Sequence, residues 1–277
     1  MNEEFKGNLE ILDRDSGSGC ELNDRDLAIF SCLEAHGASS LGQIWAGFFK
    51  EVNSETVPWL FLDQAASARG IFTRVYKRLL KLVEHGYLER LSMRQNMLFR
   101  LSSKGHWQLI KRQINRFSHA STGWPKEVEL HHALLINACA LTLTKGLGLK
   151  VKSERQVRQE FMAEALKGFE QEMEVVPDMM VFIGDRQRRF ELELHLKSNA
   201  RYKEYWDSLD APMCSPRPYL FYVAGTPAIK SHLLALAEED YSPGLYVCDL
   251  QDFKQSLGRC EFFNPFGRKF SLTETII

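Results

Sequence analysis

The stretch from Val176 to Lys197 constrains the fold of this chain more than any other, because it has the pattern of a β-hairpin. Residues 190–197 (FELELHLK) alternate strictly between apolar and polar side chains, which is the two-residue period of a strand with one buried face. Gly184-Asp185 supplies turn chemistry between this arm and an apolar first arm. The sequence therefore predicts two antiparallel strands, the second of which carries its polar side chains on one face.

The register of this hairpin gathers acidic side chains. Pairing about the turn places Asp178 opposite Glu191, and Glu193 follows on the same face. Neighbouring Cβ atoms at such positions lie roughly 4.5–8 Å apart, so three carboxylates repel one another unless a cation lies among them. Carboxylate oxygens favour Mg²⁺ or Mn²⁺, and we therefore predict a divalent metal site at these three residues. The alternative is an amphipathic strand whose acids are simply solvated.

Basic residues are concentrated in one region of a nearly neutral chain. The 277 residues have a formal net charge of −1. Residues 65–126, by contrast, contain 13 Lys and Arg against 2 Glu, a difference of 11. This asymmetry is typical of a surface that binds a polyanion such as DNA.

The basic region belongs to a segment, residues 22–117, with the pattern of a winged helix-turn-helix domain. Apolar periodicity and caps predict helices at about 23–34, 40–48 and 67–84, then strands at 88–93 and 97–101 and a further helix. The third helix has a basic outer face and is the expected major-groove element, with Arg94 at the tip of the wing. The predicted DNA-contacting residues of this segment are Arg69, Arg74, Lys77, Arg78, Lys81 and Arg94. Winged helices also bind proteins, and a basic face can be merely solvated, but the charge asymmetry favours DNA.

Composition divides the rest of the chain. Residues 1–21 are expected to be a loosely ordered leader and 118–126 a linker, which leaves 127–277 as a second domain. Its predicted order is helix, strand, helix, hairpin, helix, strand, helix, strand, so we expect an α/β (α+β) fold with a mixed sheet flanked by helices. The six cysteines are widely spaced and include no CxxC pair, which favours reduced thiols. The sequence also has no apolar run of membrane-spanning length and no signal peptide, so we expect a cytoplasmic protein.

A resemblance to known families rests on short motifs. Residues 127–250, with Pro177-Asp178 and Glu191-Leu192-Glu193, resemble the core of the PD-(D/E)xK nuclease superfamily. Together with the winged helix and His131-His132, the chain is similar to plasmid replication-relaxation proteins and MobC-type mobilisation relaxases. The resemblance implies a restriction-endonuclease-like second domain and a metal-dependent endonuclease that nicks DNA at the transfer origin of a plasmid or mobile element. Other mobilisation (relaxosome) proteins are then expected partners.

The resemblance also implies roles for single residues. It points to His131 as the histidine that faces the acidic cluster, with a capping or surface histidine as the equal alternative. The superfamily usually has lysine where this chain has Glu193. Lys197 is then expected to approach the phosphate and stabilise its charge if the strand persists that far, with Glu193 as an added ligand or base. Otherwise the site has kept binding and lost cleavage.

Residues around the hairpin carry less specific expectations. Arg201 and Lys203, at the start of the next helix, are expected to contact DNA phosphates. Tyr202 and Tyr205 share a helical face, where core packing is expected ahead of a role as nucleophile. His195 is equally a metal ligand or an outward-facing residue.

Two other functions remain open from the sequence. One is a DNA-binding regulator or accessory factor with a vestigial nuclease fold. The other is a restriction-type or transposon-end endonuclease, which has the same chemistry and a different target.

Glu154 stands at a predicted helix start. A glutamate at this position is explained first by its favourable interaction with the helix dipole, and only second as an additional metal ligand.

Overall fold

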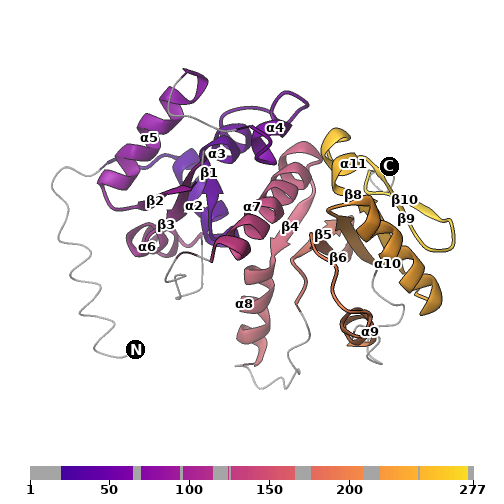
Figure 1. Ribbon diagram of the computed structural model, residues 1–277. Coiled ribbons are helices and arrows are strands. Elements are labelled where there is room, and N and C mark those ends of the chain that lie inside the picture. The colour runs from indigo at the N-terminus through magenta and orange to yellow at the C-terminus, as the bar shows by residue number, and fades with distance from the viewer. Residues whose placement is uncertain are drawn as a thin grey trace.

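The computed structural model describes residues 20–64, 70–93, 96–114, 124, 126–165, 176–208, 219–242 and 244–273. These residues form an α+β protein with a three-stranded antiparallel sheet and a seven-stranded mixed sheet (Figure 1), which confirms the predicted class. Most of the predicted leader and linker lie outside the described residues, as do Arg69 and Arg94.

The N-terminal part has the element order predicted for a winged helix. Its elements are α2 (Asp24–His36), β1 (Ser39–Ser40), α3 (Leu41–Phe48), α4 (Val57–Leu60), the 3-10 turn η1 (Gly70–Phe72), α5 (Thr73–Glu84), β2 (Leu88–Met93), β3 (Asn96–Leu101) and α6 (Ser103–Lys111). Asn23, Ser40 and Ser102 cap helices through their side chains, which is why these helices begin where the sequence indicates. The α-helical part of the predicted third helix begins later than expected, at Thr73, after the 3-10 turn.

The C-terminal part contains the predicted mixed sheet. Its elements are α7 (Glu127–Leu141), the π-helical turn η2 (Thr142–Gly146), β4 (Lys150–Ser153), α8 (Glu154–Ala165), β5 (Met179–Ile183), β6 (Arg186–Glu193), α9 (Asn199–Ser208), β7 (Leu220–Ala224), α10 (Pro227–Glu239), β8 (Leu245–Asp249), α11 (Leu250–Gln255), β9 (Glu261–Phe263) and β10 (Lys269–Ser271). The strand order is β10-β9-β8-β7-β6-β5-β4, with β6, β7 and β8 parallel and the other neighbours antiparallel.

The hairpin of β5 and β6 has the predicted register. Met179 pairs with Phe190, and one further step in the same register sets Asp178 opposite Glu191. The expectation that the strand persists to Lys197 was wrong, because β6 ends at Glu193. Its parallel partner β7 ends at the same level, at Ala224, so no ladder remains to hold the chain extended. Leu196, predicted to share the buried face, is accordingly 53% exposed.

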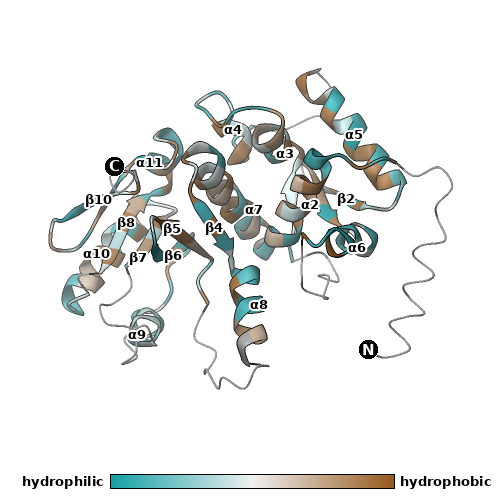
Figure 2. Ribbon diagram, turned by 180° about the vertical axis from the view of Figure 1, so that it is seen from behind, coloured by the Kyte–Doolittle hydropathy of each residue, from teal (hydrophilic) through white to brown (hydrophobic). Residues whose placement is uncertain are grey.

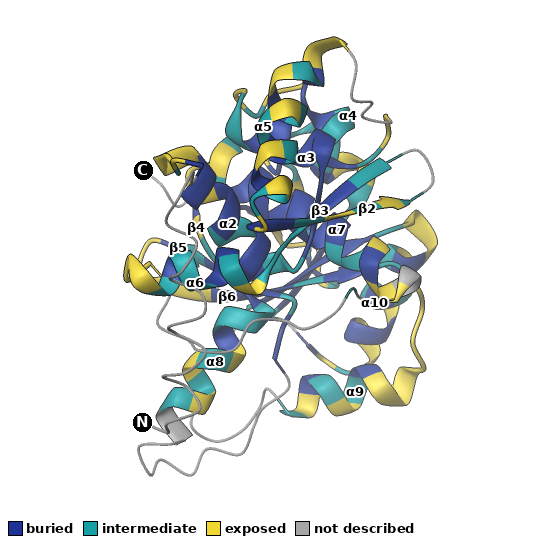
Figure 3. Ribbon diagram, turned by 90° about the vertical axis from the view of Figure 1, so that its left-hand side faces the viewer, coloured by how far each residue is buried: buried dark blue, intermediate teal, exposed yellow. Residues whose placement is uncertain are grey.

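Helix α7 joins the two parts of the molecule. It lies between the winged helix and the seven-stranded sheet (Figure 1), and most of its residues from Leu134 onward are buried, whereas α5 and α9 have exposed outer faces (Figure 3). The Gln43 side chain of α3 donates to the Leu134 carbonyl at 2.6 Å, and the Asn137 amide donates to the Ser39 hydroxyl at 2.6 Å. One hydrophobic core runs through both predicted domains. Helix α5 and the seven-stranded sheet therefore belong to one packed unit.

Candidate active site

A cleft of about 1310 Å³ lies at the carboxyl end of β6. Its walls come from both halves of the molecule, since His36 at the end of α2 and Met93 at the end of β2 face the start of α7 and the segment after β6. The predicted catalytic residues that line this cleft are Asp178, Glu191, Glu193, Lys197 and His131. Residues far apart in the sequence are thus collected in one concave site.

Asp178 is held from three directions. Its carboxylate Oδ2 accepts the Leu192 N–H at 2.8 Å, and its carbonyl accepts the Glu154 N–H at 3.0 Å. The His132 Nε2 lies 3.6 Å from the same carboxylate oxygen and 3.0 Å from the Leu192 carbonyl. These contacts fix the side chain at the mouth of the hairpin, with α7, α8 and β6 all contributing.

Glu191 is the carboxylate that faces Asp178. Burial raises the pKa of Glu191 well above its ordinary value, and the nearby Asp178 raises it further, while a hydrogen bond from the Tyr205 hydroxyl opposes the shift. Burial also raises the pKa of Asp178, which the proximity of His132 opposes. Two half-buried carboxyl groups that face each other disfavour double ionisation. A divalent cation between them would offset both effects, so this pair fits a metal ion.

Glu193 has a different environment from that pair. It is buried, and its Oε2 lies 2.7 Å from the Lys197 ammonium. In the part of the chain that the structure describes, no group of three or more His, Cys, Asp or Glu side chains is arranged as a metal site. The predicted three-carboxylate cluster is therefore replaced by the Asp178–Glu191 pair and a separate Glu193–Lys197 ion pair. Mg²⁺ is commonly bound by one or two carboxylates with retained waters, so two carboxylates remain a suitable donor set.

Histidines line much of the cleft. His132 makes the contact with Asp178, and His131, the residue preferred from the sequence, lines the same cleft. His195 is exposed at the rim. His36, which the sequence indicated only as a helix stop, also lines the cleft, and burial lowers its pKa to about 4. His36 is therefore neutral at neutral pH.

The two tyrosines of α9 pack against the site. Tyr202 is buried against Trp206 at 6.0 Å between ring centres, and its hydroxyl accepts the Lys197 N–H at 3.2 Å. Burial raises the pKa of Tyr202 to about 12. Burial and the adjacent Glu191 raise the pKa of Tyr205. Both side chains are held as neutral phenols that position neighbouring groups, which favours the packing role over the nucleophilic one.

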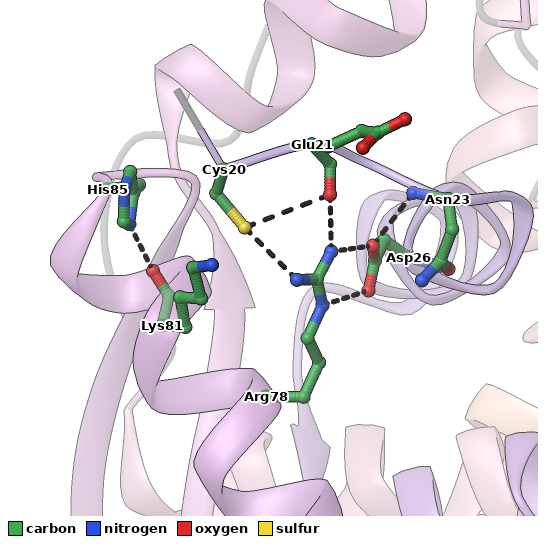
Figure 4. Close-up of polar contacts among 7 residues, drawn as sticks. All are labelled: Cys20, Glu21, Asn23, Asp26, Arg78, Lys81 and His85. Atoms are coloured by element: carbon green, nitrogen blue, oxygen red, sulfur yellow. Dashed lines mark hydrogen bonds and ion pairs between the residues drawn. The ribbon is translucent and has the colours of Figure 1, made fainter. Parts of the chain in front are cut away.

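Helix α5 divides its basic residues between solvent and the protein. Arg74, Lys77 and Lys81 are exposed, opposite the buried apolar stripe that gives α5 its two-sided hydropathy in Figure 2. Arg78 instead points at α2, where its Nε donates to Asp26 Oδ1 at 3.0 Å and its Nη2 pairs with Oδ2 (Figure 4). Arg78, predicted from the sequence to contact DNA, thus anchors α5 to α2.

The Arg78 anchor has further partners in the segment before α2. Its Nη2 donates to the Glu21 carbonyl at 2.7 Å, and its Nη1 lies 3.1 Å from the Cys20 sulfur (Figure 4).

The two residues of α9 predicted to contact DNA have different environments. Arg201 is exposed and lines the cleft, whereas the Lys203 ammonium lies 3.4 Å from a carboxylate oxygen of Glu239.

A charged contact that the sequence did not suggest connects the winged helix to the cleft. Arg155, in the first turn of α8, donates from Nη1 to the Glu34 carbonyl at 3.2 Å, and its Nη2 lies 3.2 Å from the Glu34 carboxylate. The neighbouring Glu154 pairs its carboxylate with Arg158 at 2.6 Å, in keeping with a helix-start glutamate. Helix α2 is therefore fixed to α5 at one end and to α8, beside Asp178, at the other.

Comparisons with known proteins give no match: no protein-family model, no curated protein and no solved structure matches this chain.

Among the described helices, none combines the length and apolar character needed to cross a membrane. The five cysteines within the described residues are free thiols, three of them buried.

Proposed function

We propose that this protein is a metal-dependent DNA endonuclease that nicks one strand. The observation that carries the proposal is the half-buried Asp178–Glu191 pair in a cleft that the winged helix helps to form. The resemblance to plasmid replication-relaxation proteins and MobC-type relaxases suggests the setting, which is a transfer origin of a plasmid or mobile element. Mobilisation proteins are the corresponding partners, and the cytoplasm is the corresponding compartment.

DNA is supported as the substrate by positive charge on α5 and within the cleft. Exposed Arg74, Lys77 and Lys81 give α5 a basic outer face suited to phosphates in and beside the major groove. Lys197 and Arg201 add positive charge to the cleft itself. A strand entering the cleft would meet these cations beside the carboxylate pair.

Asp178 and Glu191 are the residues that would hold Mg²⁺ or Mn²⁺. When bound, such an ion neutralises phosphate charge and lowers the pKa of a bound water. The Leu192 N–H and His132 orient the Asp178 carboxylate, and the Tyr205 hydroxyl orients that of Glu191. This fixed placement reduces the reorganisation that the site undergoes during reaction.

Lys197 is proposed to stabilise the negative charge that develops on the phosphate. Glu193 holds its ammonium group at 2.7 Å, so the charge is positioned although the residue follows the end of β6. The buried Glu193 thereby takes a supporting role in place of the metal ligation expected from the sequence. Removing Lys197 is expected to slow cleavage while leaving metal binding intact.

Nicking of supercoiled plasmid that carries the native locus tests the proposal. With Mn²⁺ or Mg²⁺ the wild-type protein should yield open-circular DNA, and EDTA, Asp178→Asn and Glu191→Gln should each abolish this product. Glu261→Gln, at an exposed position of β9, removes a carboxylate that does not line the cleft and should cleave normally. Intact DNA binding without nicking at any metal concentration would instead favour a DNA-binding regulator with a vestigial nuclease fold. That second candidate is favoured by one observation, the glutamate at the usual lysine position.

A further inference from the structure

An arginine on β6 is buried, and none of the described residues gives it a carboxylate partner. Arg188 is 9% exposed, and its guanidinium carbon lies 4.5 Å from the centre of the Tyr219 ring. Its Nη1 donates to the Gln187 carbonyl at 3.3 Å, and within the described residues its buried Nε has no hydrogen-bond partner. A buried charge is normally paired, so this guanidinium is a feature of the fold that its protein contacts leave unexplained.

Arg186 precedes Arg188 by two residues and so projects from the same face of β6. Burial first, and then the like charge of Arg186, lowers the pKa of Arg188. Arg268, which directly precedes β10, and Arg188 both act on Tyr246: their positive charges oppose the rise that burial causes in the pKa of that tyrosine. Among the described residues no carboxylate forms an ion pair with any of the three arginines. The positive charges of these arginines are offset when an anion binds among them.

Aromatic rings form the floor of this basic site. Tyr219 lies 5.5 Å from Tyr246 and 6.3 Å from Phe270, measured between ring centres, and Tyr219 and Phe270 are partly exposed. Stacking on Tyr219 holds the Arg188 guanidinium in one plane, and a planar guanidinium binds phosphate through two parallel hydrogen bonds. The residue is thus oriented before any ligand binds.

The site is separate from the catalytic cleft. Arg188 shares its face of β6 with Phe190, whereas Glu191 and Glu193 project from the opposite face. Glu193 lies five residues further along the strand, which corresponds to about 17 Å at 3.3 Å per residue. The three arginines do not line the cleft. Asp185, in the β5–β6 turn, is the carboxylate next to Arg186 in the chain, whereas Glu261, paired with Lys269 at 2.8 Å, projects from the face of the sheet opposite to Phe270.

We propose that Arg186, Arg188 and Arg268 form a phosphate-binding site that holds the backbone of DNA outside the catalytic cleft. The assignment of the phosphate to DNA rests on the proposed function, whereas the anion site rests on the three arginines alone. A contact here would hold DNA against the sheet at a second point, remote from α5. It adds an anchor on the C-terminal part of the protein to the one provided by the winged helix.

Titration with inorganic phosphate tests the anion site without DNA. The arginine Nε–H signals of the full-length protein are followed by NMR, with sodium chloride at matched ionic strength as the comparison. The signal of Arg188, assigned by its loss in Arg188→Lys, should shift saturably with phosphate and much less with chloride. Arg186→Met and Arg268→Met, both at exposed positions, should each weaken the response severalfold. Equal shifts with chloride, or an unchanged response in both exposed variants, would overturn the site.

Salt-dependent DNA binding tests the source of the phosphate. Arg186→Met and Arg268→Met should each reduce the slope of log affinity against log salt by about one unit. Lys269→Met removes the same charge nearby from a residue already paired with Glu261, and should leave the slope unchanged. Saturable phosphate binding with unchanged slopes would overturn the assignment to DNA. Because neither measurement involves cleavage, a protein that fails to nick DNA still gives a clear answer here.

Discussion

Replacing Arg78 by methionine tests whether this residue anchors α5 or contacts DNA. Asp26, its partner, has a side chain that is 2% exposed, and removing one member of a buried ion pair typically costs about 3–5 kcal/mol. Two features reduce that figure: the Arg78 side chain is 24% exposed, and the Asp26 carboxylate keeps a hydrogen bond from the Asn23 N–H at 2.9 Å. We therefore expect Arg78→Met to lower the unfolding free energy by about 2–3 kcal/mol.

Urea unfolding and DNA binding together provide the assay. Arg74→Met is the matched control, because Arg74 is exposed on the same helix and its loss should change stability by less than about 0.5 kcal/mol. The DNA results should be reversed, with Arg74→Met reducing the salt slope by about one unit and Arg78→Met leaving it unchanged. The anchoring role is refuted if Arg78→Met costs no more stability than the control or reduces the slope equally.

Two further predictions concern the carboxyl pair and a close backbone approach. Burial and Asp178 raise the pKa of Glu191, so the protonated side chain contributes its full stability below about pH 4.3, and this contribution is lost as pH rises through the raised pKa. In metal-free urea unfolding, Glu191→Gln should therefore be more stable than the wild type at pH 8, and the difference in unfolding free energy should close toward pH 4. A difference of opposite sign would contradict this. A β-carbon at Gly105 would lie 2.3 Å from the Tyr87 carbonyl oxygen, so Gly105→Ala should lose roughly 1–3 kcal/mol of unfolding free energy, and an unchanged melting temperature would show that the contact relaxes at no cost.

The hairpin could be predicted because its determinants are local. The glycine-aspartate turn fixes the register, and the register alone brings Asp178 opposite Glu191. The end of β6 was not predictable in the same way, because it depends on where β7 stops, about 30 residues later in the chain. The elements α11, β9 and β10 were missed because a helix of six residues and strands of three carry too little periodicity to be recognised.

The environment of the site depended on packing that local patterns do not encode. Each residue of a helix is rotated by about 100° from the one before, so the choice between His131 and His132 depends on how α7 lies against the sheet. Arg155 and Glu34 are 121 residues apart, and their contact follows from the shared core of the two halves. Lys197 reaches Glu193 across a segment that the sequence predicted as strand.

The central claim is that Asp178 and Glu191 form the metal centre, and calorimetric titration of EDTA-treated protein with Mn²⁺ tests it most directly. We expect one Mn²⁺ per chain, with proton release detected as a heat that varies with the buffer, because the carboxyl pair favours a protonated state before the metal binds. Asp178→Asn and Glu191→Gln should abolish this binding, and Glu193→Gln should retain it, because Glu193 is paired with Lys197. Absence of binding in the wild type, or equal binding in wild type and Glu191→Gln, would contradict the account.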